Sequence, residues 1–216
     1  MRLGPTVRRE TGPWTPAAHA LLRHLESVGF DAAPRVLGID ERGREILTYL
    51  EGETVGDDDP RPAWWRDDDT LVQAIMLLRR FHSEGATFNP PSDALWRFEG
   101  SGDPGVTIVH GDWAPYNVVW RRGAVVGVID WDLARPAIHS TTSRSRHGTG
   151  HRCITPACSP RASSGHGTTM ERERRLRLLV DTYASRIERG SRSGSRRGCT
   201  RVPTASSRWL RRATRA

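Results

Sequence analysis

Side chains that could do chemistry are concentrated in one short apolar stretch, "IVHGDWAPYNVVWRRGAVVGVIDWD" (108–132). It carries Asp112, Asn117, Asp130 and Asp132 among the valines and isoleucines that are typical of buried strands. Buried carboxylates destabilise a protein unless a positive charge compensates them. Oxygen ligands of this kind suit Mg²⁺, which proteins commonly hold with one or two carboxylates plus substrate phosphates. The stretch therefore predicts a site for Mg²⁺ and a nucleotide, with Asn117 and Asp130 as metal ligands and Asp132 as a further candidate.

Asp112 follows a predicted strand, 106–110, and lies in a loop, where a rigid scaffold can present a reacting group. A carboxylate at this position could accept the proton of a substrate hydroxyl, a general-base role that typically contributes about 10²- to 10⁴-fold in rate. Beside a metal-bound nucleotide, the expected chemistry is phosphoryl transfer by positioning and charge neutralisation.

A hairpin must bring these residues together. The 13 residues from Asn117 to Asp130 would span about 45 Å if they were fully extended. Apolar runs lie on either side of 121–123, a short segment that ends in a glycine able to take a positive φ. The hairpin returns Asp130 to the sheet edge that holds Asp112 and Asn117.

The remaining periodicity predicts an α+β chain. Apolar residues recur at helical spacing over 15–28, with Thr15 as the expected N-cap, and again over 70–84. Short β-branched or alternating runs predict a strand at 6–10 and two strands around a turn at 41–43. The chain therefore has a strand-rich start, followed by a helix and the polar hairpin.

Charge divides the chain into two parts. Residues 1–135 hold 15 Arg and 21 Asp plus Glu, a balance of −6, whereas 136–216 hold 18 Arg and 4 acids, a balance of +14, and together they give the net +8. Residues 137–169 contain no acidic residue, and this segment and the one from 185 onward have the composition of disordered chain. Between them, apolar positions at helical spacing predict a helix at 170–184.

The motif "HGDWAPYN", followed 13 residues after its Asn by "IDWD", resembles the signature of the aminoglycoside phosphotransferase and choline kinase-like family. The resemblance implies a two-lobed protein-kinase-like fold and ATP-dependent phosphate transfer to a hydroxyl of a small molecule, with ATP and Mg²⁺ as cofactors. It implies that Asp112 is the catalytic base and that Asn117 and Asp130 are the magnesium ligands. His110 matches the family's histidine that braces the catalytic loop.

The segment "LTYLEG" (47–52) is similar to the family's hinge, whose backbone contacts adenine. The resemblance implies that the residues contacting the nucleotide base are Thr48, Tyr49 and Leu50. Arg8 or Arg9 could contact phosphate, where the family normally uses a strand lysine, and Arg8 is the assigned candidate. The chain contains no lysine.

By this resemblance, 1–50 form a partial N-lobe, 51–136 a C-lobe with the catalytic loop and the metal-binding hairpin, and 137–216 an irregular basic tail. Five residues precede Thr6, so the strands that cover the phosphates in the family are expected to be missing. After "IDWD" the family continues G-D-P-x-x-D-L-A. One permitted codon choice for 136–150, taken two bases later, encodes GDPLDDLAFAARHW, which suggests that this segment is out of frame.

Other functions remain open. The chain could be an inactive, truncated or frameshifted relative without turnover, or its arginine-rich tail could bind nucleic acid with strong salt dependence. The second alternative is weak because Trp209 is the only tryptophan of the tail. A zinc site from His147, His151, Cys153 and Cys158 fits no structural spacing.

The acceptor is also open, because an antibiotic, choline, an amino sugar or a homoserine-like compound would each supply a hydroxyl. The sequence contains no apolar run of about 18 residues that would span a membrane, and its start lacks the apolar core of a secretory signal. A cytoplasmic location without membrane contact is therefore expected.

Overall fold

The computed structural model describes residues 1–56, 62–98, 107–137 and 169–185. The chain divides into two compact units, Met1–Ser185 and Arg186–Ala216. The second unit lies outside the described residues. So do the segment of the suggested frame change beyond residue 137, the four zinc candidates and the arginine-rich end.

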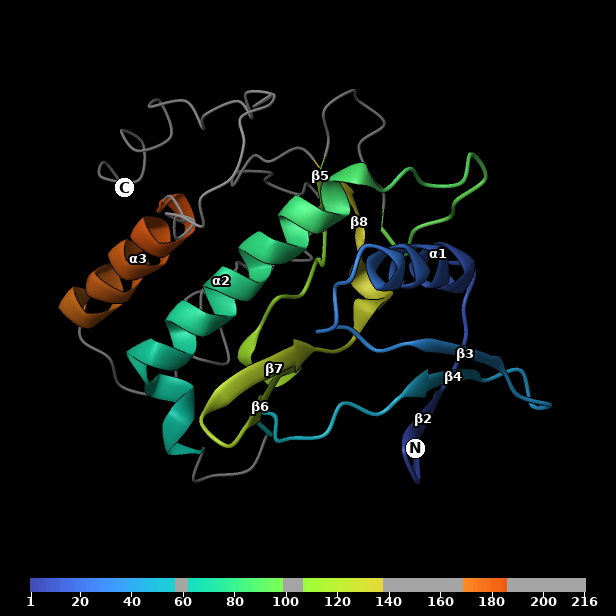
Figure 1. The fold of residues 1–216 in the computed structure, drawn as a ribbon, viewed down its shortest axis with the longest axis horizontal. Coiled ribbons are helices and arrows are strands. Elements are labelled where there is room, and N and C mark those ends of the chain that lie inside the picture. The colour runs from blue at the N-terminus through green and yellow to red at the C-terminus, as the bar shows by residue number, and fades with distance from the viewer. Residues whose placement is uncertain (57–61, 99–106, 138–168, 186–216) are drawn as a thin grey trace, which may run out of the picture. The chain divides into compact units, whose positions relative to one another are not determined.

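The N-terminal part is one antiparallel sheet in the order β1-β2-β4-β3 (Figure 1). Its strands are β1 (Arg2–Leu3), β2 (Thr6–Arg9), β3 (Val36–Ile39) and β4 (Glu45–Thr48). Between β3 and β4, the carboxylate of Asp40 accepts hydrogen bonds from the backbone N–H groups of Arg42 and Arg44. Gly43 has φ of 76° there, a left-handed conformation that glycine adopts without steric cost. The predicted turn is confirmed.

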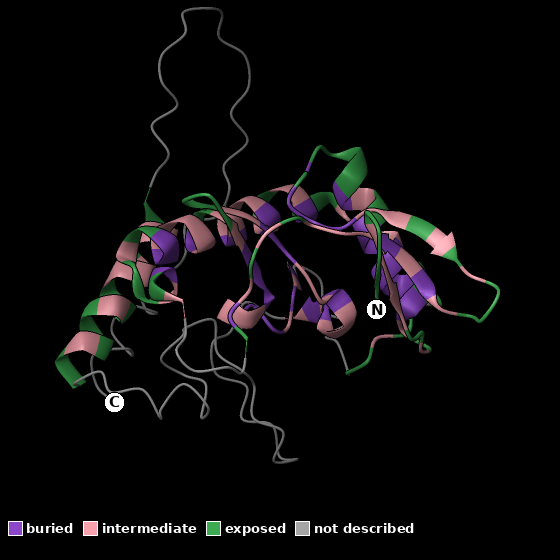
Figure 2. Cartoon of the chain, turned by 90° about the horizontal axis from the view of Figure 1, so that it is seen from below, coloured by how far each residue is buried: buried purple, intermediate pink, exposed green. Residues whose placement is uncertain are grey.

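Helix α1 (Thr15–Ser27) connects β2 to β3. The predicted cap is wrong: Trp14 is the N-cap residue and Thr15 is already helical. The Thr15 hydroxyl instead accepts a hydrogen bond from the backbone N–H of Gly12 at 2.9 Å, so it stabilises the turn before the helix. The apolar face carries the fully buried Leu21 and Leu25, and Figure 2 shows buried residues concentrated on this helix.

The second part of the chain is built on helix α2 (Asp68–Glu84), which is flanked by the short 3₁₀ helices η1 (Ala63–Arg66) and η2 (Gly85–Thr87). The apolar residues that α2 buries are Leu71, Ile75, Leu78 and Phe81, as its periodicity predicted. Acidic residues in the first turn, Asp68 and Asp69, favour this end of the helix electrostatically.

The polar stretch forms two small antiparallel sheets. One pairs β5 (Thr107–Val109) with β8 (Arg135–Ala137), and the other is the hairpin of β6 (Val118–Arg121) and β7 (Ala124–Val128). At the hairpin turn Arg122 has φ of 50° and Gly123 has φ of 87°, as a two-residue turn with the right twist requires. The 3₁₀ helices η3 (Pro115–Asn117) and η4 (Trp131–Leu133) follow β5 and β7. The hairpin prediction is confirmed.

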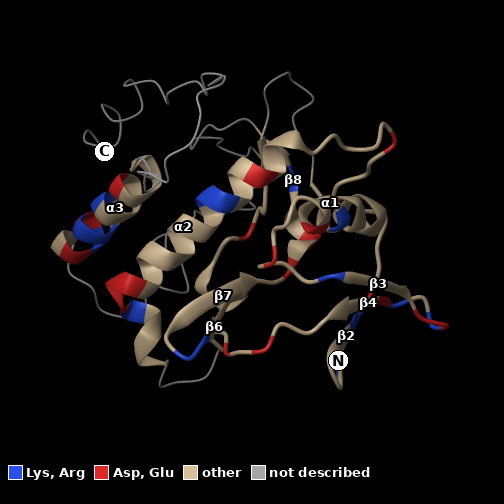
Figure 3. Cartoon of the chain, in the orientation of Figure 1, with Lys and Arg blue, Asp and Glu red and all other residues tan. Residues whose placement is uncertain are grey.

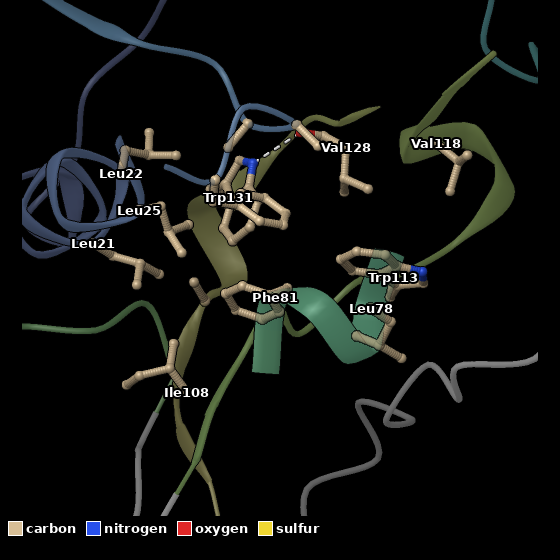
Figure 4. Close-up of a cluster of buried hydrophobic side chains, with 14 of the residues drawn as sticks. Leu21, Leu22, Leu25, Leu78, Phe81, Ile108, Trp113, Val118, Val128 and Trp131 are labelled. Atoms are coloured by element: carbon tan, nitrogen blue, oxygen red, sulfur yellow. Dashed lines mark hydrogen bonds between the residues drawn. The ribbon is translucent and has the colours of Figure 1, made fainter. Parts of the chain in front are cut away.

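One continuous apolar core joins α1, α2 and the hairpin (Figure 4). Trp131, 2% exposed, lies at its centre, with its ring 5.0 Å from that of Phe81 in an edge-to-face arrangement. Its indole N–H donates to the carbonyl of Val128 at 3.0 Å, so this large side chain is buried without an unpaired donor. Because Trp131 lies between Asp130 and Asp132, the core fixes the position of both carboxylates.

Helix α3 (Thr169–Ala184) lies where its periodicity predicted a helix, and it buries no residue. It contacts α2 through polar groups and through the ring of Tyr183, which packs against the apolar core. Arg174 pairs with Asp68, and the Tyr183 hydroxyl is 2.7 Å from Nδ1 of His82. Figure 3 shows the charged positions of α3 and those at the start of α2. None of the described helices has the length and apolar composition to cross a membrane.

Candidate active site

The loop after β5 holds Asp112 in a fixed orientation. The side-chain nitrogen of Asn117 donates to the Asp112 backbone carbonyl at 2.9 Å and to carboxylate Oδ2 at 3.1 Å. The hydroxyl of Tyr116 donates to Oδ1 at 2.7 Å. Asp112 is 8% exposed, so both carboxylate oxygens are oriented in a nearly dry environment. Each oxygen retains a further lone pair that could accept a proton.

His110 joins this loop to the hairpin. Its Nε2 donates to the carbonyl of Ile129 at 3.0 Å, and its Nδ1 accepts the backbone N–H of Asp112 at 3.3 Å. These partners require a neutral ring with the proton on Nε2, since a carbonyl can only accept. Burial lowers the pKa of His110 to about 4, so the ring stays neutral near pH 7. The structure thus places His110 as a brace between the two segments.

Backbone bonds complete the junction between loop and hairpin. The N–H of Ile129 donates to the carbonyl of Asn117 at 2.9 Å, so both backbone groups of Ile129 are bonded to the loop. Asp130 follows directly, with φ of 64° and ψ of 68°, a left-handed conformation that is unfavourable for residues with a Cβ and better tolerated by Asp than by most. The structure therefore brings together Asp112, Asn117 and Asp130, as the hairpin pattern predicted.

Arg9, at the end of β2, reaches the same edge. Its Nη2 lies 2.7 Å from Asp130 Oδ1 and 2.9 Å from Asp132 Oδ2, and its Nη1 lies 3.4 Å from Glu45 Oε1. Burial lowers the pKa of the Arg9 guanidinium, but the Asp132, Asp130 and Glu45 carboxylates outweigh burial and raise it. Arg9 is thus a cation that compensates all three of these acids.

Arg8, the assigned phosphate candidate, is not brought to this cluster. Its guanidinium donates to the Thr6 hydroxyl at 2.7 Å and lies 3.8 Å from Asp40. Because successive side chains of a strand point to opposite faces, only one of Arg8 and Arg9 can face the acids. The structure places Arg9 there.

Glu45 and His19 belong to the site and were missed by the sequence analysis. Glu45 lies opposite Arg9 in the β2–β4 register and is 3% exposed. Its Oε2 is 2.8 Å from Nε2 of His19 on α1. The available signals were a glutamate alternating with apolar residues in a strand and a histidine on the apolar face of a helix. Glu45 therefore contacts both Arg9 on β2 and His19 on α1.

Asp132 is engaged by arginines. Its Oδ2 also lies 3.4 Å from Nη1 of Arg97, and its side chain is 15% exposed. Burial raises the pKa of the Asp132 carboxyl, although the Arg9 guanidinium lowers it. Asp132 therefore serves as an ion-pair partner of Arg9 rather than as an open metal ligand.

The residues fit a magnesium ion that shares its coordination with phosphates. Asn117 uses its nitrogen on Asp112, which leaves its oxygen available, and the Asp130 side chain is 44% exposed. Within the described ranges no three His, Cys, Asp or Glu side chains are grouped to hold a metal. One carboxylate and one amide oxygen would therefore need phosphate oxygens to complete the shell, which is the usual arrangement for Mg²⁺.

The hinge candidates begin with Thr48, the last residue of β4, and continue toward the hairpin. The backbone N–H of Thr48 donates to Arg35 and that of Tyr49 to Pro5, at 2.9 and 2.8 Å. These two groups are thus occupied by the chain itself. Leu50 packs on β7, since a Cβ on Gly127 would lie 2.7 Å from its Cδ1. The adenine contact of this segment stays a prediction.

The chain is similar to known proteins. The sequence model of the phosphotransferase enzyme family (APH) matches residues 93–138, which include the loop and the hairpin. The trifolitoxin immunity protein of Rhizobium leguminosarum bv. trifolii is 38% identical over 195 residues, covering 88% of this chain and 72% of that protein.

Among solved structures, a choline/ethanolamine kinase family protein from Mesorhizobium loti aligns with a TM-score of 0.45 at 15% identity, over 85% of this chain and 74% of that one. The relative's identity holds along most of both chains, and the family match falls on the residues that form the site. The chain therefore belongs to the phosphotransferase enzyme family (APH), and its described residues form an α+β fold.

Proposed function

We propose that this protein transfers the γ-phosphoryl group of ATP to a hydroxyl of a small molecule. The observation that carries the proposal is the bonded junction of His110, Asn117 and Ile129, which holds a buried carboxylate and an exposed carboxylate at one edge. A fixed base beside a cation site is the arrangement that phosphoryl transfer requires.

Asp112 is the proposed base. The acceptor oxygen forms a bond to the γ-phosphorus, the bond from that phosphorus to the β–γ bridging oxygen breaks, the hydroxyl proton passes to Asp112, and ADP leaves. The hydrogen bonds from Tyr116 and Asn117 orient the carboxylate before the substrate binds. Such preorganisation avoids reorganisation during the reaction.

Asn117 and Asp130 are the proposed magnesium ligands, through their side-chain oxygens. Bound there, Mg²⁺ would neutralise phosphate charge. Arg9 is the proposed phosphate contact in place of the family's strand lysine, because its planar guanidinium can bind two oxygens at once. Thr48, Tyr49 and Leu50 remain the proposed segment beside the adenine, and the ATP requirement favours a cytoplasmic location.

The relative's name suggests a biological setting. The protein named trifolitoxin immunity protein is similar along 88% of this chain. We therefore put forward, as a second level of the same function, that phosphate transfer by this protein protects its cell from a toxin. Kinase activity on a purified hydroxyl compound and loss of toxin resistance in a cell lacking the gene would test the two levels separately.

Asp112→Asn tests the chemistry. This near-isosteric change removes the base, so the rate of ATP-dependent phosphate transfer should fall by at least about 100-fold. Affinity for Mg²⁺–ATP, measured by titration calorimetry, should change little. Wild-type protein that binds nucleotide but transfers no phosphate to any hydroxyl acceptor would identify an inactive relative and would refute the proposal.

A further inference from the structure

Two buried polar side chains close to Arg9 have no part in the proposed function. Glu45, on β4, is 3% exposed, and His19, on α1, is 5% exposed. Glutamate is almost never fully buried unless it is paired, and removing a charged group from water without a partner is costly. The contacts of this pair therefore indicate what the buried carboxylate holds.

The two oxygens of Glu45 have different surroundings. Oε2 lies 2.8 Å from Nε2 of His19, so the helix fixes the orientation of the carboxylate. Oε1 lies 3.4 Å from Nη1 of Arg9, and it has no hydrogen-bond partner among the described residues. A charge-assisted hydrogen bond is shorter, about 2.7–2.9 Å. Glu45 is thus anchored through one oxygen, and the other keeps unused acceptor capacity beside Arg9.

The two terminal nitrogens of Arg9 also differ in their partners. Nη2 bonds to Asp130 at 2.7 Å and to Asp132 at 2.9 Å, whereas Nη1 lies beside Glu45. The Asp130 side chain is 44% exposed and that of Glu45 is 4% exposed. A ligand from solvent can reach the exposed carboxylate but not the buried one. The contact of Arg9 with Asp130 can therefore be exchanged, and the contact with Glu45 is permanent.

Strand pairing keeps Glu45 beside Arg9 whatever happens at Asp130. The two residues lie directly opposite each other in the β2–β4 ladder, where Cβ atoms are about 4.5–5.5 Å apart. The hairpin strands that lead to Asp130 belong to a different sheet. Because the guanidinium donors form a rigid fork, an acceptor at Nη1 limits the directions in which Nη2 can point once Asp130 is released.

We propose that Glu45, oriented by His19, positions Arg9 for the phosphates of the nucleotide. The inference rests on the proposed function, in which Asp130 is a metal ligand and Arg9 contacts phosphate. When Asp130 binds the metal, Arg9 gives up this carboxylate, keeps Glu45 and offers Nη2 to a phosphate oxygen. Glu45 and His19 act through Arg9, so they are positioning residues and not catalytic ones.

Glu45→Gln separates this role from a simple effect of charge. The change keeps the size of the side chain and removes one negative charge near the proposed phosphate site. If Glu45 were only another acid there, its neutralisation would leave the binding of an anionic nucleotide unchanged or strengthen it. If Glu45 positions Arg9, Mg²⁺–ATP should bind about 10-fold more weakly, the lower end of the losses seen for residues that support a ligand-binding group. Titration calorimetry on the full chain measures the affinity.

Two comparisons assign the loss to Arg9. Asp40→Asn is the matched control, because Asp40 pairs with Arg8 on the opposite face of β2, and its nucleotide affinity should equal that of the wild type. In an Arg9→Met background, Glu45→Gln should cause no further loss, since residues that act through one another are not additive. Urea denaturation checks that each variant is folded.

His19 supplies a second, independent pair of variants. His19→Leu removes the hydrogen bond to Glu45 and should weaken Mg²⁺–ATP binding by about 3-fold. His19→Gln can again donate to the carboxylate, so it should recover most of that loss. If Glu45→Gln does not fold, this pair decides, and unchanged affinity in His19→Leu then overturns the proposal.

The outcomes separate the positioning role from the proposed function. Equal or tighter nucleotide binding by Glu45→Gln, or the same loss in the Arg9→Met background, would overturn the positioning role. A loss that depends on Arg9, in a protein that transfers no phosphate to any hydroxyl, would support the positioning role and count against the proposed function. Phosphate transfer without coupling between Glu45 and Arg9 would do the reverse. Wild-type protein that binds no Mg²⁺–ATP would overturn both.

Discussion

The two sides of the candidate site are built from different interactions. On one side, neutral hydrogen bonds join His110, Asn117 and Ile129, residues that lie close together in the sequence. On the other side, charges join Arg9 to Glu45 and to Asp130, which follows Arg9 by 121 positions. The neutral side fixes geometry, and the charged side compensates the acids. We infer from this difference that the hydrogen-bonded side is a rigid support. The charged side is a contact in which Arg9 can exchange one anionic partner for another.

Removing the proposed metal ligand should have the largest effect. Asp130→Ala deletes the exposed carboxylate but leaves the backbone bonds of Ile129 in place. We expect the Mg²⁺-dependent gain in ATP affinity to fall by about 100-fold, the upper end of losses seen even for residues that only support a ligand. Titration calorimetry with and without Mg²⁺ would measure it. Equal affinities for the variant and the wild type would show that Asp130 holds no metal.

Breaking the charged side should destabilise the fold. Arg9→Met leaves Glu45, 3% exposed, without its cation. The free energy of unfolding should drop by about 2–3 kcal/mol, less than for a fully buried pair because the guanidinium is partly exposed. Urea denaturation checks this.

Arg8→Met is the matched control on the opposite face of β2. Arg8 contacts Thr6 and Asp40, and it does not contact the acids that Arg9 pairs with. The urea midpoint of the Arg8→Met variant should therefore stay close to that of the wild type. If Arg9→Met and Arg8→Met lose the same free energy of unfolding, the two faces of β2 do not differ in the way proposed.

The neutral side should respond to pH. The folded-state pKa of His110 is about 4, below the usual 6.5, so between these values the unfolded chain binds the extra proton. Stability is therefore full above pH 6.5 and declines as the pH falls toward 4, by about 2 kcal/mol between pH 7 and 5. Urea denaturation at the two pH values measures the loss. In His110→Phe this side chain cannot titrate, so the free energy of unfolding should fall less between pH 7 and pH 5. A loss as large as in the wild type would assign the effect to other groups.

The smallest effect concerns the hairpin turn. Arg122, like Asp130, has a positive φ, but only Asp130 belongs to the candidate site. Asn accepts this conformation more readily, so Arg122→Asn should stabilise the protein by about 0.5–1 kcal/mol. A higher melting temperature with unchanged nucleotide affinity is the expected result. A destabilised variant would show that the Arg122 side chain supports the turn.

Sequence reasoning recovered the side of the site that short-range patterns encode. Helical periodicity predicted the buried face of α2, and alternating apolar runs around a glycine predicted the hairpin that returns Asp130 to Asn117. The strands β1 and β8 were missed because two or three residues carry too little pattern. The cap of α1 was wrong because the Thr15 hydroxyl found a partner before the helix.

Contacts between residues that lie far apart in the chain could not be predicted from the sequence. Period-2 alternation shows that Arg8 and Arg9 face opposite ways, but it does not say which face meets the acids. The partnership of Glu45 with His19 depends on how β4 packs against α1, and neither residue type indicates it.

Ile129 connects the proposed base to the proposed metal ligand Asp130 through its main chain, because its N–H and its carbonyl are each bonded across to the loop. Asp112 and Asp130 are thereby held in one stiff unit, and we expect them to move together when the N-terminal sheet shifts. A nucleotide would then have to be admitted by displacement of β2, where Arg9 can trade one anionic partner for another. Because this link uses only backbone groups, other residue types at position 129 would preserve it.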